Sequence, residues 1–423
     1  MLMRSVPASK RQPYARAARR SRFFWRELDD GLIVVDLDAF EFTLMNGTAA
    51  LLWLELIERP RSPAALADGI ASLFEADGAA VLGDVEAILD TWRGVGWLTT
   101  GDDGTVFIDP ETDAPPPEPY RVIPERDLEA ATGNAGLEWS RDLDFPGAPV
   151  SVRFLSEPGC ERSDVSVRAA TFLAGIPTAS QASASPIMVY GTRSGMFLRL
   201  GSVCVEATDV SDALSRLVLW CFYLAYGTED FLGTFHAAAV GKDGGAILMP
   251  GGSGVGKSTL TAYLAARGWR YGGDDIVGLS RPVGGDRRHV VLPFCSSISV
   301  KQGAVAILKD AYPGLVDLPE VFYDTKRARF PAVPHCRHMG TDLGPRRISA
   351  IVFPQFDAHA RTSLTPLSTR ETVLALAGIG YRTGERMDET LLAGVFDFLD
   401  GTPAYRLAFS EISQAEAVLE KLA

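Results

Sequence analysis

The N-terminal part of the chain alternates short apolar runs with longer stretches of helical periodicity. Residues 32–37 and 41–45 are apolar, β-branched or aromatic runs separated by Asp38-Ala39, which predicts a β-hairpin. Apolar residues then recur at spacings of three and four over 48–57, 62–74 and 81–92, which predicts three amphipathic helices. Two or three strands followed by three helices is the outline of a winged helix, an α+β domain.

A proline-rich segment interrupts this periodicity. Between Asp109 and Pro124, six prolines lie among acidic and small residues: Pro110, Pro115, Pro116, Pro117, Pro119 and Pro124. This composition predicts a semi-rigid linker over 110–126, between a small domain at 27–109 and an α/β domain at 127–423. Residues 1–26 contain eight Lys and Arg residues and no acid. We expect this segment to be a basic flexible arm, with contact to an acidic partner as the alternative.

A glycine-rich motif carries the clearest chemical signal. Residues 251–259 read GGSGVGKST and fit the pattern GxxxxGK[ST], after an apolar strand at 246–249 and before a helix at 258–267. In this arrangement backbone N–H groups and a helix N-terminus point at a phosphate. The predicted nucleotide-binding residues are Gly251, Gly252, Ser253, Gly254, Val255, Gly256, Lys257, Ser258 and Thr259. We expect Lys257 to contact the β- and γ-phosphates and Ser258 to hold Mg²⁺.

Two acids and a histidine flank this motif in the sequence. A short strand at 269–271 leads into Gly272-Gly273-Asp274-Asp275, and His236 precedes the glycine-rich motif within an apolar run. If the helix runs back along the sheet and the next strand returns, both acids reach the phosphate site. One acid could then bind Mg²⁺ while the other accepts a proton from an attacking hydroxyl. The plainer alternatives are a solvated Asp-Asp turn and a core histidine.

These segments together resemble the HPr kinase family and its kinase-like relatives. The likeness lies in "FHAAAV" and "GAILMPGGSGVGKSTLTAYLAARGWRYGGDDIVGL", with His236 21 residues before Lys257 and the two acids 17 and 18 residues after it. The resemblance implies an α/β P-loop kinase that uses ATP and Mg²⁺. It also implies that Asp275 is the general base, Asp274 a magnesium-side acid and His236 a support for the base.

The chain departs from that family after the acids. In place of the family's Glu-Ile-Arg-Gly signature it has residues 296–302, SSISVKQ, so neither HPr as a substrate nor a phosphorylase reaction is implied. Three basic residues remain as candidate contacts to phosphate or acceptor: Lys301, Arg346 and Arg347. Exposure at the end of a strand is the alternative for each.

Residues 31–98 resemble the PqqD-like domains that recognise the leaders of ribosomally made peptides. The match rests on Leu44 and Asn46 at the end of a strand, Trp53 on the first helix, Ser62-Pro63 and a closing Gly-Trp-Leu. The resemblance implies that a leader adds as a strand to the sheet edge and packs against the third helix. Candidate peptide contacts are Phe42, Thr43, Leu44, Met45, Val85, Ile88 and Trp92. A purely structural domain is the alternative.

Composition and charge limit the kinds of partner and the cellular location that we expect. The chain has 423 residues, 47% of them hydrophobic and 22% charged, and a formal net charge of −12, which is unsuited to coating nucleic acid. The predicted third helix also carries three acids against Arg93 alone, which disfavours DNA. Five cysteines without a CxxC pair indicate reduced thiols, and no apolar run is long enough to span a membrane. We expect a cytoplasmic protein and leave homo-oligomerisation open.

The combined prediction is an ATP-dependent kinase that phosphorylates a Ser or Thr hydroxyl of a ribosomally synthesised precursor peptide, with the leader held by the N-terminal domain. Phosphorylation of a folded carrier protein or a small molecule is one alternative. A non-catalytic chaperone, in which nucleotide gates peptide binding, is another. The sequence does not distinguish ATP from GTP.

Overall fold

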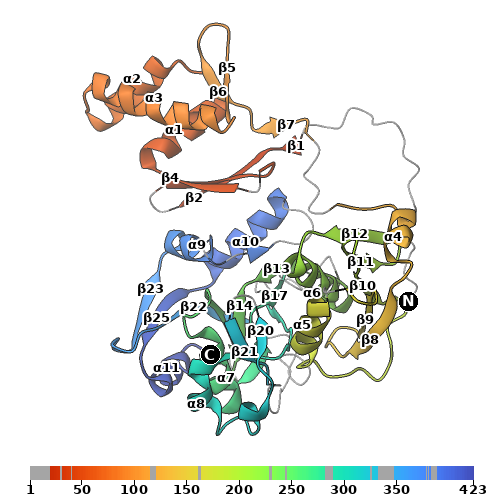
Figure 1. The fold of residues 1–423 in the computed structure, drawn as a ribbon. Coiled ribbons are helices and arrows are strands. Elements are labelled where there is room, and N and C mark those ends of the chain that lie inside the picture. Colours follow the sequence, from red (N-terminus) through yellow and green to blue (C-terminus); the bar gives the residue numbers. More distant parts are fainter. Residues whose placement is uncertain are drawn as a thin grey trace. The chain divides into compact units, whose positions relative to one another are not determined.

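A computed structural model describes residues 20–28, 31–39, 41–114, 121–160, 163–227, 231–242, 245–281, 289–323, 326–331, 347–377, 379, 381–382 and 388–423. Two compact units make up the chain (Figure 1). The first is Met1–Pro117 with Arg386–Leu392, and the second is Glu118–Glu385 with Ala393–Ala423. The division at Pro117 falls inside the proline-rich segment.

The first unit contains a three-stranded antiparallel sheet and three helices. The strands, in sheet order, are β2 (Phe23–Leu28), β3 (Gly31–Asp36) and β4 (Glu41–Asn46). They are followed by α1 (Gly47–Glu58), α2 (Pro63–Phe74), α3 (Gly78–Gly94) and a hairpin of β5 (Leu98–Thr100) and β6 (Val106–Ile108). Short polar side chains cap the helices: Asn46 accepts from the Ala49 N–H, and Ser62 accepts from the Ala65 N–H with Pro63 in the first turn.

An aromatic cluster forms the centre of this unit. The indole of Trp53 on α1 is fully buried and meets Phe23, Trp92 and Trp97 edge to face, at ring distances of 5.1, 5.7 and 5.3 Å. Such contacts add to the free energy gained from burying the ring area. Phe23 is therefore a core residue of a folded strand.

This core corrects two predicted boundaries. Residues 20–21 form strand β1 (Arg20–Ser21) and residues 23–26 belong to β2, so the predicted flexible arm of 1–26 extends too far. Residues 1–19 lie outside the described part of the chain. The predicted linker is also too long at both ends, since β7 (Glu111–Thr112) pairs with β1 and α4 (Glu125–Thr132) begins at its other end. The basic and proline-rich composition of these segments did not indicate the short elements β1, β7 and α4.

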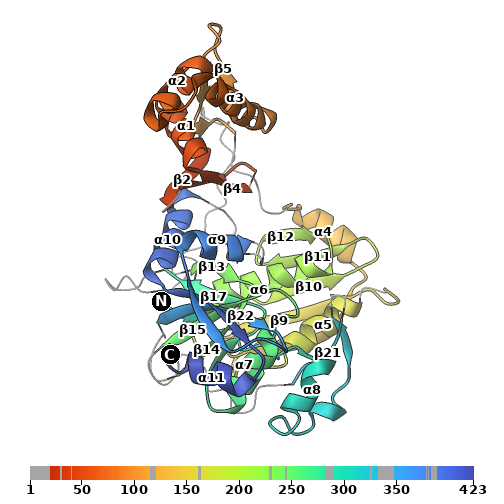
Figure 2. The same ribbon diagram turned by 90° about the vertical axis from the view of Figure 1, so that its left-hand side faces the viewer.

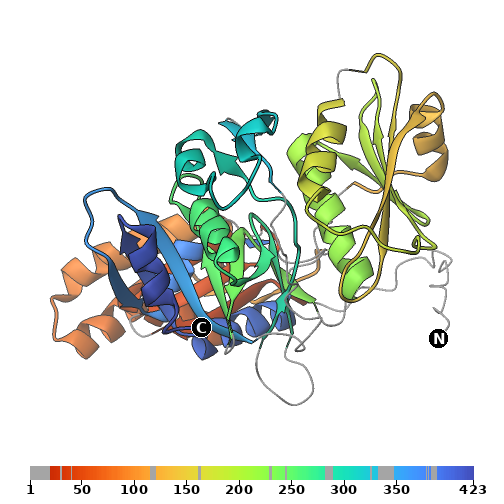
Figure 3. The same ribbon diagram turned by 90° about the horizontal axis from the view of Figure 1, so that it is seen from below.

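The second unit begins with a five-stranded sheet in the order β12-β11-β10-β9-β8. Its elements are β8 (Gly136–Leu143), β9 (Val150–Ser156), α5 (Ser163–Leu173), β10 (Ile187–Gly191), β11 (Met196–Leu200), β12 (Val203–Ala207) and α6 (Val210–Tyr226). Alternate residues of β10 pack on opposite faces: Ile187 and Val189 join the core beneath α5 and α6, and Met188 and Tyr190 face α4. Figure 3 shows this sheet as a separate layer in yellow and yellow-green.

The candidate site is built on a second, six-stranded sheet in the order β16-β14-β15-β22-β25-β23. Its strands are β14 (Ala237–Gly241), β15 (Ala246–Pro250), β16 (Arg270–Gly273), β22 (Ile348–Phe356), β23 (Ser363–Leu367) and β25 (Ala404–Phe409). β15, β22 and β25 are parallel, whereas β14 is antiparallel to both of its neighbours. Helices α7 (Lys257–Ala266) and α11 (Ile412–Leu419) lie side by side on one face (Figures 1 and 2) and bury Leu260 and Leu419 against it.

Smaller elements complete the second unit. One sheet joins β18 (Val291–Leu292), β17 (Val277–Ser280), β13 (Phe231–Phe235) and β24 (Tyr381–Arg382). Another joins β19 (Val300–Lys301), β21 (Lys326–Arg329) and β20 (Val321–Tyr323). The remaining helices are α8 (Gln302–Leu308), α9 (Thr369–Ala377), a 3₁₀ turn at Leu315–Asp317 and α10 (Glu389–Gly401), which belongs to this unit from Ala393 onward. None of the helices that the structure describes combines the length and apolar character needed to cross a membrane.

Candidate functional site

The glycine-rich segment connects strand β15 to helix α7. Gly254 and Gly256 have φ angles of +97° and +93°, a left-handed backbone that strongly favours glycine. Gly256 is also the N-cap of α7, and a Cβ there would lie 3.0 Å from the Cβ of Phe356. These glycines allow the loop to turn sharply and leave the first N–H groups of α7 open toward the space in front of it.

Strand direction brings His236 and the two acids to the same loop. Ala237, the first residue of β14, pairs with Pro250, the last residue of β15, so His236 lies next to the start of the loop. β16 is antiparallel to β14 and therefore runs in the same direction as β15. Its C-terminal end delivers Asp274 and Asp275 to the edge of the sheet where the glycine-rich loop begins.

Lys257 is the centre of the resulting charge cluster. Its Nζ lies 3.2 Å from Asp274 Oδ1 and 3.0 Å from Asp275 Oδ1, and its side chain is only 4% exposed. Nε2 of His236 is 4.0 Å from the same Asp275 oxygen. Asp275 has a φ of +69°, which is unusual for a residue other than glycine and aims its carboxylate back at Lys257. The structure thus groups all four predicted catalytic residues.

Burial and the two opposite charges set the ionisation of this cluster. Burial disfavours the ammonium of Lys257, but the two carboxylates outweigh that effect and raise its pKa. Burial also raises the pKa of Asp274, and the Lys257 charge offsets this only in part. For Asp275 the charges of Lys257 and His236 outweigh burial and lower the pKa. Burial and Lys257 lower the pKa of His236, so its imidazole is neutral at pH 7.

One carboxylate oxygen of Asp274 differs from the other in its hydrogen bonding. Oδ2 of this buried carboxylate has no hydrogen-bond partner among the residues that the structure describes, while the hydroxyl of Ser258 is close enough to help lower the pKa of the group. An unpaired buried carboxylate oxygen is costly and calls for a cation or donor. A carboxylate and a hydroxyl are ligands that Mg²⁺ accepts, usually together with waters and phosphate oxygens. The described residues contain no cluster of three or more His, Cys, Asp or Glu side chains suited to a metal.

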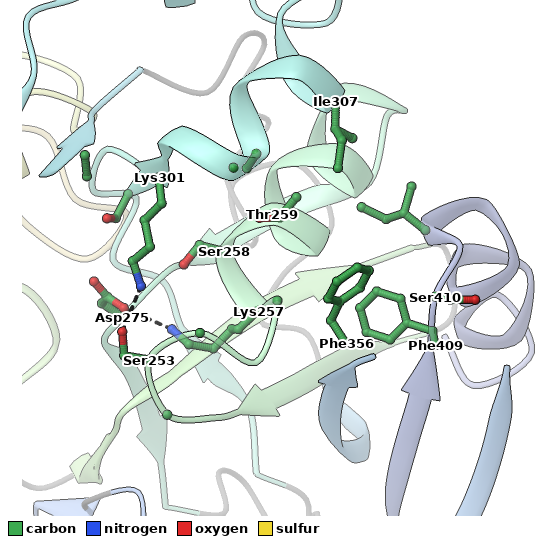
Figure 4. A pocket seen from close by; sticks show the side chains of 18 of the residues that line it. Ser253, Lys257, Ser258, Thr259, Asp275, Lys301, Ile307, Phe356, Phe409 and Ser410 are labelled. Atoms are coloured by element: carbon green, nitrogen blue, oxygen red, sulfur yellow. Dashed lines mark hydrogen bonds and ion pairs between the residues drawn. The ribbon is translucent and has the colours of Figure 1, made fainter. Parts of the chain in front are cut away.

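A cavity of about 660 Å³ opens in front of the loop. The loop and helix residues Ser253, Gly254, Lys257 and Ser258 line it together with His236 and Asp275. Lys301, the last residue of β19, reaches across and donates from Nζ to Ser253 Oγ at 2.8 Å (Figure 4). Of the three basic residues proposed for phosphate or acceptor contact, Lys301 is placed at the cavity.

Arg347, a second basic candidate, lies away from the site. Arg347 precedes β22, which is parallel to β15, and its carbonyl accepts from the Ala246 N–H at the start of β15. Nine residues of extended strand, about 30 Å at 3.3 Å each, separate Arg347 from Phe356 beside the loop. The proposed contact of Arg347 with phosphate is therefore wrong, because strand direction puts it at the opposite edge of the sheet. Arg346 lies outside the described residues.

In the first unit β4 is an edge strand, and the predicted peptide contacts differ in how exposed their side chains are. Thr43 and Leu44 are partly exposed, Phe42 is 44% exposed, and Ile88 on α3 is partly exposed. The side chains of Met45, Val85 and Trp92 are instead buried in the core of the unit, and the predicted peptide contacts of these residues stay predictions. Helical spacing identifies an apolar face, but it does not tell a residue packed in the core from one beside an open groove.

Sequence reasoning missed several residues that line the cavity. Ser299, Ile307, Phe356 and Phe409 come from separate elements, and no local motif joins them to the glycine-rich loop. Phe356 and Phe409 each end a strand parallel to β15, at the same edge of the sheet. Only that shared strand direction could have suggested them.

Comparisons with known proteins address each unit separately. The family model described as "Coenzyme PQQ synthesis protein D (PqqD)" matches residues 31–98, which confirms the predicted PqqD-like segment. Among solved structures, the Hpr(Ser) kinase/phosphatase from Coxiella burnetii is matched with 12% identity over 45% of this chain and 92% of that chain, at a TM-score of 0.22. At that TM-score the likeness supports no argument about mechanism. The search of curated proteins finds no match.

Proposed function

We propose that the chain is an ATP- and Mg²⁺-dependent kinase that phosphorylates a hydroxyl of a ribosomally synthesised precursor peptide. The observation that carries the proposal is the contact of one buried lysine, Lys257, with both Asp274 and Asp275 in front of a glycine-rich loop. A loop of this type, a lysine and a pair of acids are the groups that phosphoryl transfer requires. The sequence resemblance to HPr kinases supports the same chemistry.

Each residue of the site has a separate role in the proposed reaction. The acceptor oxygen attacks the γ-phosphorus, the bond from that phosphorus to the β–γ bridging oxygen breaks, and the hydroxyl proton passes to the carboxylate of Asp275. Asp274 and Ser258 would hold Mg²⁺, which when bound neutralises phosphate charge. Lys257 would leave the carboxylates for the phosphates, and loss of its charge from Asp275 would raise the pKa of that base toward the useful range.

Substrate recruitment is assigned to the first unit. The PqqD match over 31–98 and the open edge of β4 support binding of a leader peptide by strand addition. A leader held there would concentrate the attached acceptor near the kinase site, on the order of millimolar for a short tether. The kinase site itself then needs little affinity for the acceptor sequence.

The test is incubation of the full chain with ATP, Mg²⁺ and the small precursor-like peptide encoded beside its gene, followed by mass spectrometry. A gain of one phosphate on a Ser or Thr, absent with Asp275→Asn, is the expected result. Peptide that binds but stays unmodified would favour the nucleotide-gated chaperone instead. If a carrier protein or small molecule is phosphorylated while the peptide is not, the substrate is of that class and not a precursor peptide.

A further inference from the structure

The cavity has two ends of different chemistry. Lys257, Asp275, Ser253 and Lys301 gather at one end, and Ile307, Phe356 and Phe409 lie at the other (Figure 4). Ile307 on α8 is 51% exposed and Phe356 at the end of β22 is 49% exposed, although both are large apolar side chains. Figure 4 shows them pointing toward the same space from opposite sides. Two exposed apolar walls facing one another in a cavity are typical of a site for an apolar ligand group.

The aromatic wall is held in place relative to the loop. The backbone N–H of Phe356 donates to the Val255 carbonyl at 3.0 Å, which ties the end of β22 to the glycine-rich loop. Its ring meets the buried ring of Phe409 edge on, with centroids 5.8 Å apart and planes at 69°. The exposed face of Phe356 is therefore fixed at a set distance from the phosphate-facing groups, as a stacking surface needs to be.

Two polar side chains at this end already have hydrogen-bond partners. Oγ of Ser410 donates to the Ala360 carbonyl at 2.8 Å, and the carboxylate of Glu411 accepts from Nε2 of Gln414 at 2.8 Å. Contact with a ligand there would consequently depend on stacking area more than on hydrogen bonds. Selection by stacking area favours a large flat ring over a small one and tolerates changes in its polar edge.

We propose that this end of the cavity is a slot for a purine base, with Phe356 as the stacking wall and Ile307 as the opposite wall. The proposal rests on the proposed use of a nucleoside triphosphate, whose phosphates would reach the glycine-rich loop, and it adds which bases are accepted. Adenine and guanine nucleotides bind with similar affinity, and both bind more tightly than cytidine or uridine nucleotides.

The experiment is calorimetric titration of the full chain with ATP, GTP, CTP and inorganic tripolyphosphate, each with Mg²⁺. Alanine replacement of an aromatic that stacks on a base costs about 1–3 kcal/mol, so Phe356→Ala should weaken ATP and GTP binding about 5- to 150-fold. Tripolyphosphate affinity should stay unchanged, because that ligand has no base. Ile307→Ala should weaken ATP by a smaller factor, and Phe356→Tyr should retain binding.

Leu374→Ala is the matched control, since Leu374 on α9 is 51% exposed and does not line the cavity. Equal loss of ATP and tripolyphosphate in Phe356→Ala would show that the ring supports the loop and not a base, and would overturn the slot. CTP binding as tightly as ATP to the unaltered chain would overturn it too. If the slot behaves as expected but no peptide is phosphorylated, the slot stands and the kinase proposal falls.

Discussion

Replacing Lys257 by Met tests the charge cluster directly, through stability in the absence of any ligand. Methionine keeps most of the apolar stem and removes the ammonium that contacts Asp274 and Asp275. Two adjacent carboxylates, one of them 1% exposed, then lose their shared cation. Removing one partner of a buried ion pair costs about 3–5 kcal/mol, because the remaining charge stays buried and uncompensated.

This cost converts into a measurable melting shift. The second unit has about 300 residues. With an unfolding entropy of about 2.1 cal/mol/K per residue it loses about 1.6 °C per kcal/mol, so the variant should melt about 5–8 °C lower. The matched control is Lys242→Met, which removes a lysine paired with Glu420 where both side chains are more than 40% exposed. Exposed pairs are worth at most about 1 kcal/mol, so the control should melt within about 2 °C of the unaltered chain.

The pH dependence has a definite sign. In the folded protein the pKa of Asp275 is lowered, so this group stabilises the fold above the pKa of the unfolded chain, and the effect is lost as pH falls. Without Lys257 the largest effect that opposes burial is gone, so the pKa values of the two carboxyls rise. The penalty in Lys257→Met is then largest at neutral and alkaline pH and shrinks as the carboxyls protonate. The stability gap to the unaltered chain should therefore be wider at pH 8 than at pH 5.

Differential scanning calorimetry at pH 5 and pH 8 measures both effects. The double variant Lys257→Met/Asp275→Asn should recover part of the lost stability at pH 8, because only one buried carboxylate remains. Equal melting temperatures for Lys257→Met and the unaltered chain, or a gap that does not change with pH, would refute the view that Lys257 compensates two buried charges.

Three further outcomes follow from the site and the sheet edge. Asp275→Asn should leave ATP binding within a few-fold by calorimetry and lower peptide phosphorylation by about 10²-fold, the scale expected for loss of a general base. Lys301→Ala, which removes the donor to Ser253 Oγ, should reduce the phosphorylation rate about tenfold while the melting temperature stays unchanged. Thr43→Pro and Leu44→Pro each remove one backbone N–H from the edge strand β4. In one of the two variants the lost N–H points away from β3, and that variant should lose leader binding in fluorescence anisotropy with little loss of stability.

Each of these has a contradicting result. Parallel loss of binding and turnover in Asp275→Asn would make that residue a metal ligand, and normal turnover would remove it from the mechanism. Full activity of Lys301→Ala would leave Lys301 as a loop contact only. Leader binding that survives both proline variants would exclude strand addition along β4.

The sequence by itself determined the local elements of the site. The glycines of the loop, Lys257 and the spacing to Asp274 and Asp275 are fixed by covalent order, and a sharp strand-loop-helix turn leaves little choice of conformation. The start of the second helix was predictable for the same reason, because Ser62 bonds to an N–H group only three residues away.

Tertiary structure alone decided which residues from distant parts of the chain pack against those elements or face them across the cavity. Periodicity gave α3 an apolar face, but packing against Trp53 made Val85 and Trp92 core residues and left Ile88 partly exposed. Strand direction placed Arg347 at one edge of the sheet and Phe356 at the other, although both flank or end the same strand. Ile307 and Phe356 face one another across a cavity from elements nearly fifty residues apart. Such contacts depend on chain direction and packing at long sequence separation, which no local pattern encodes.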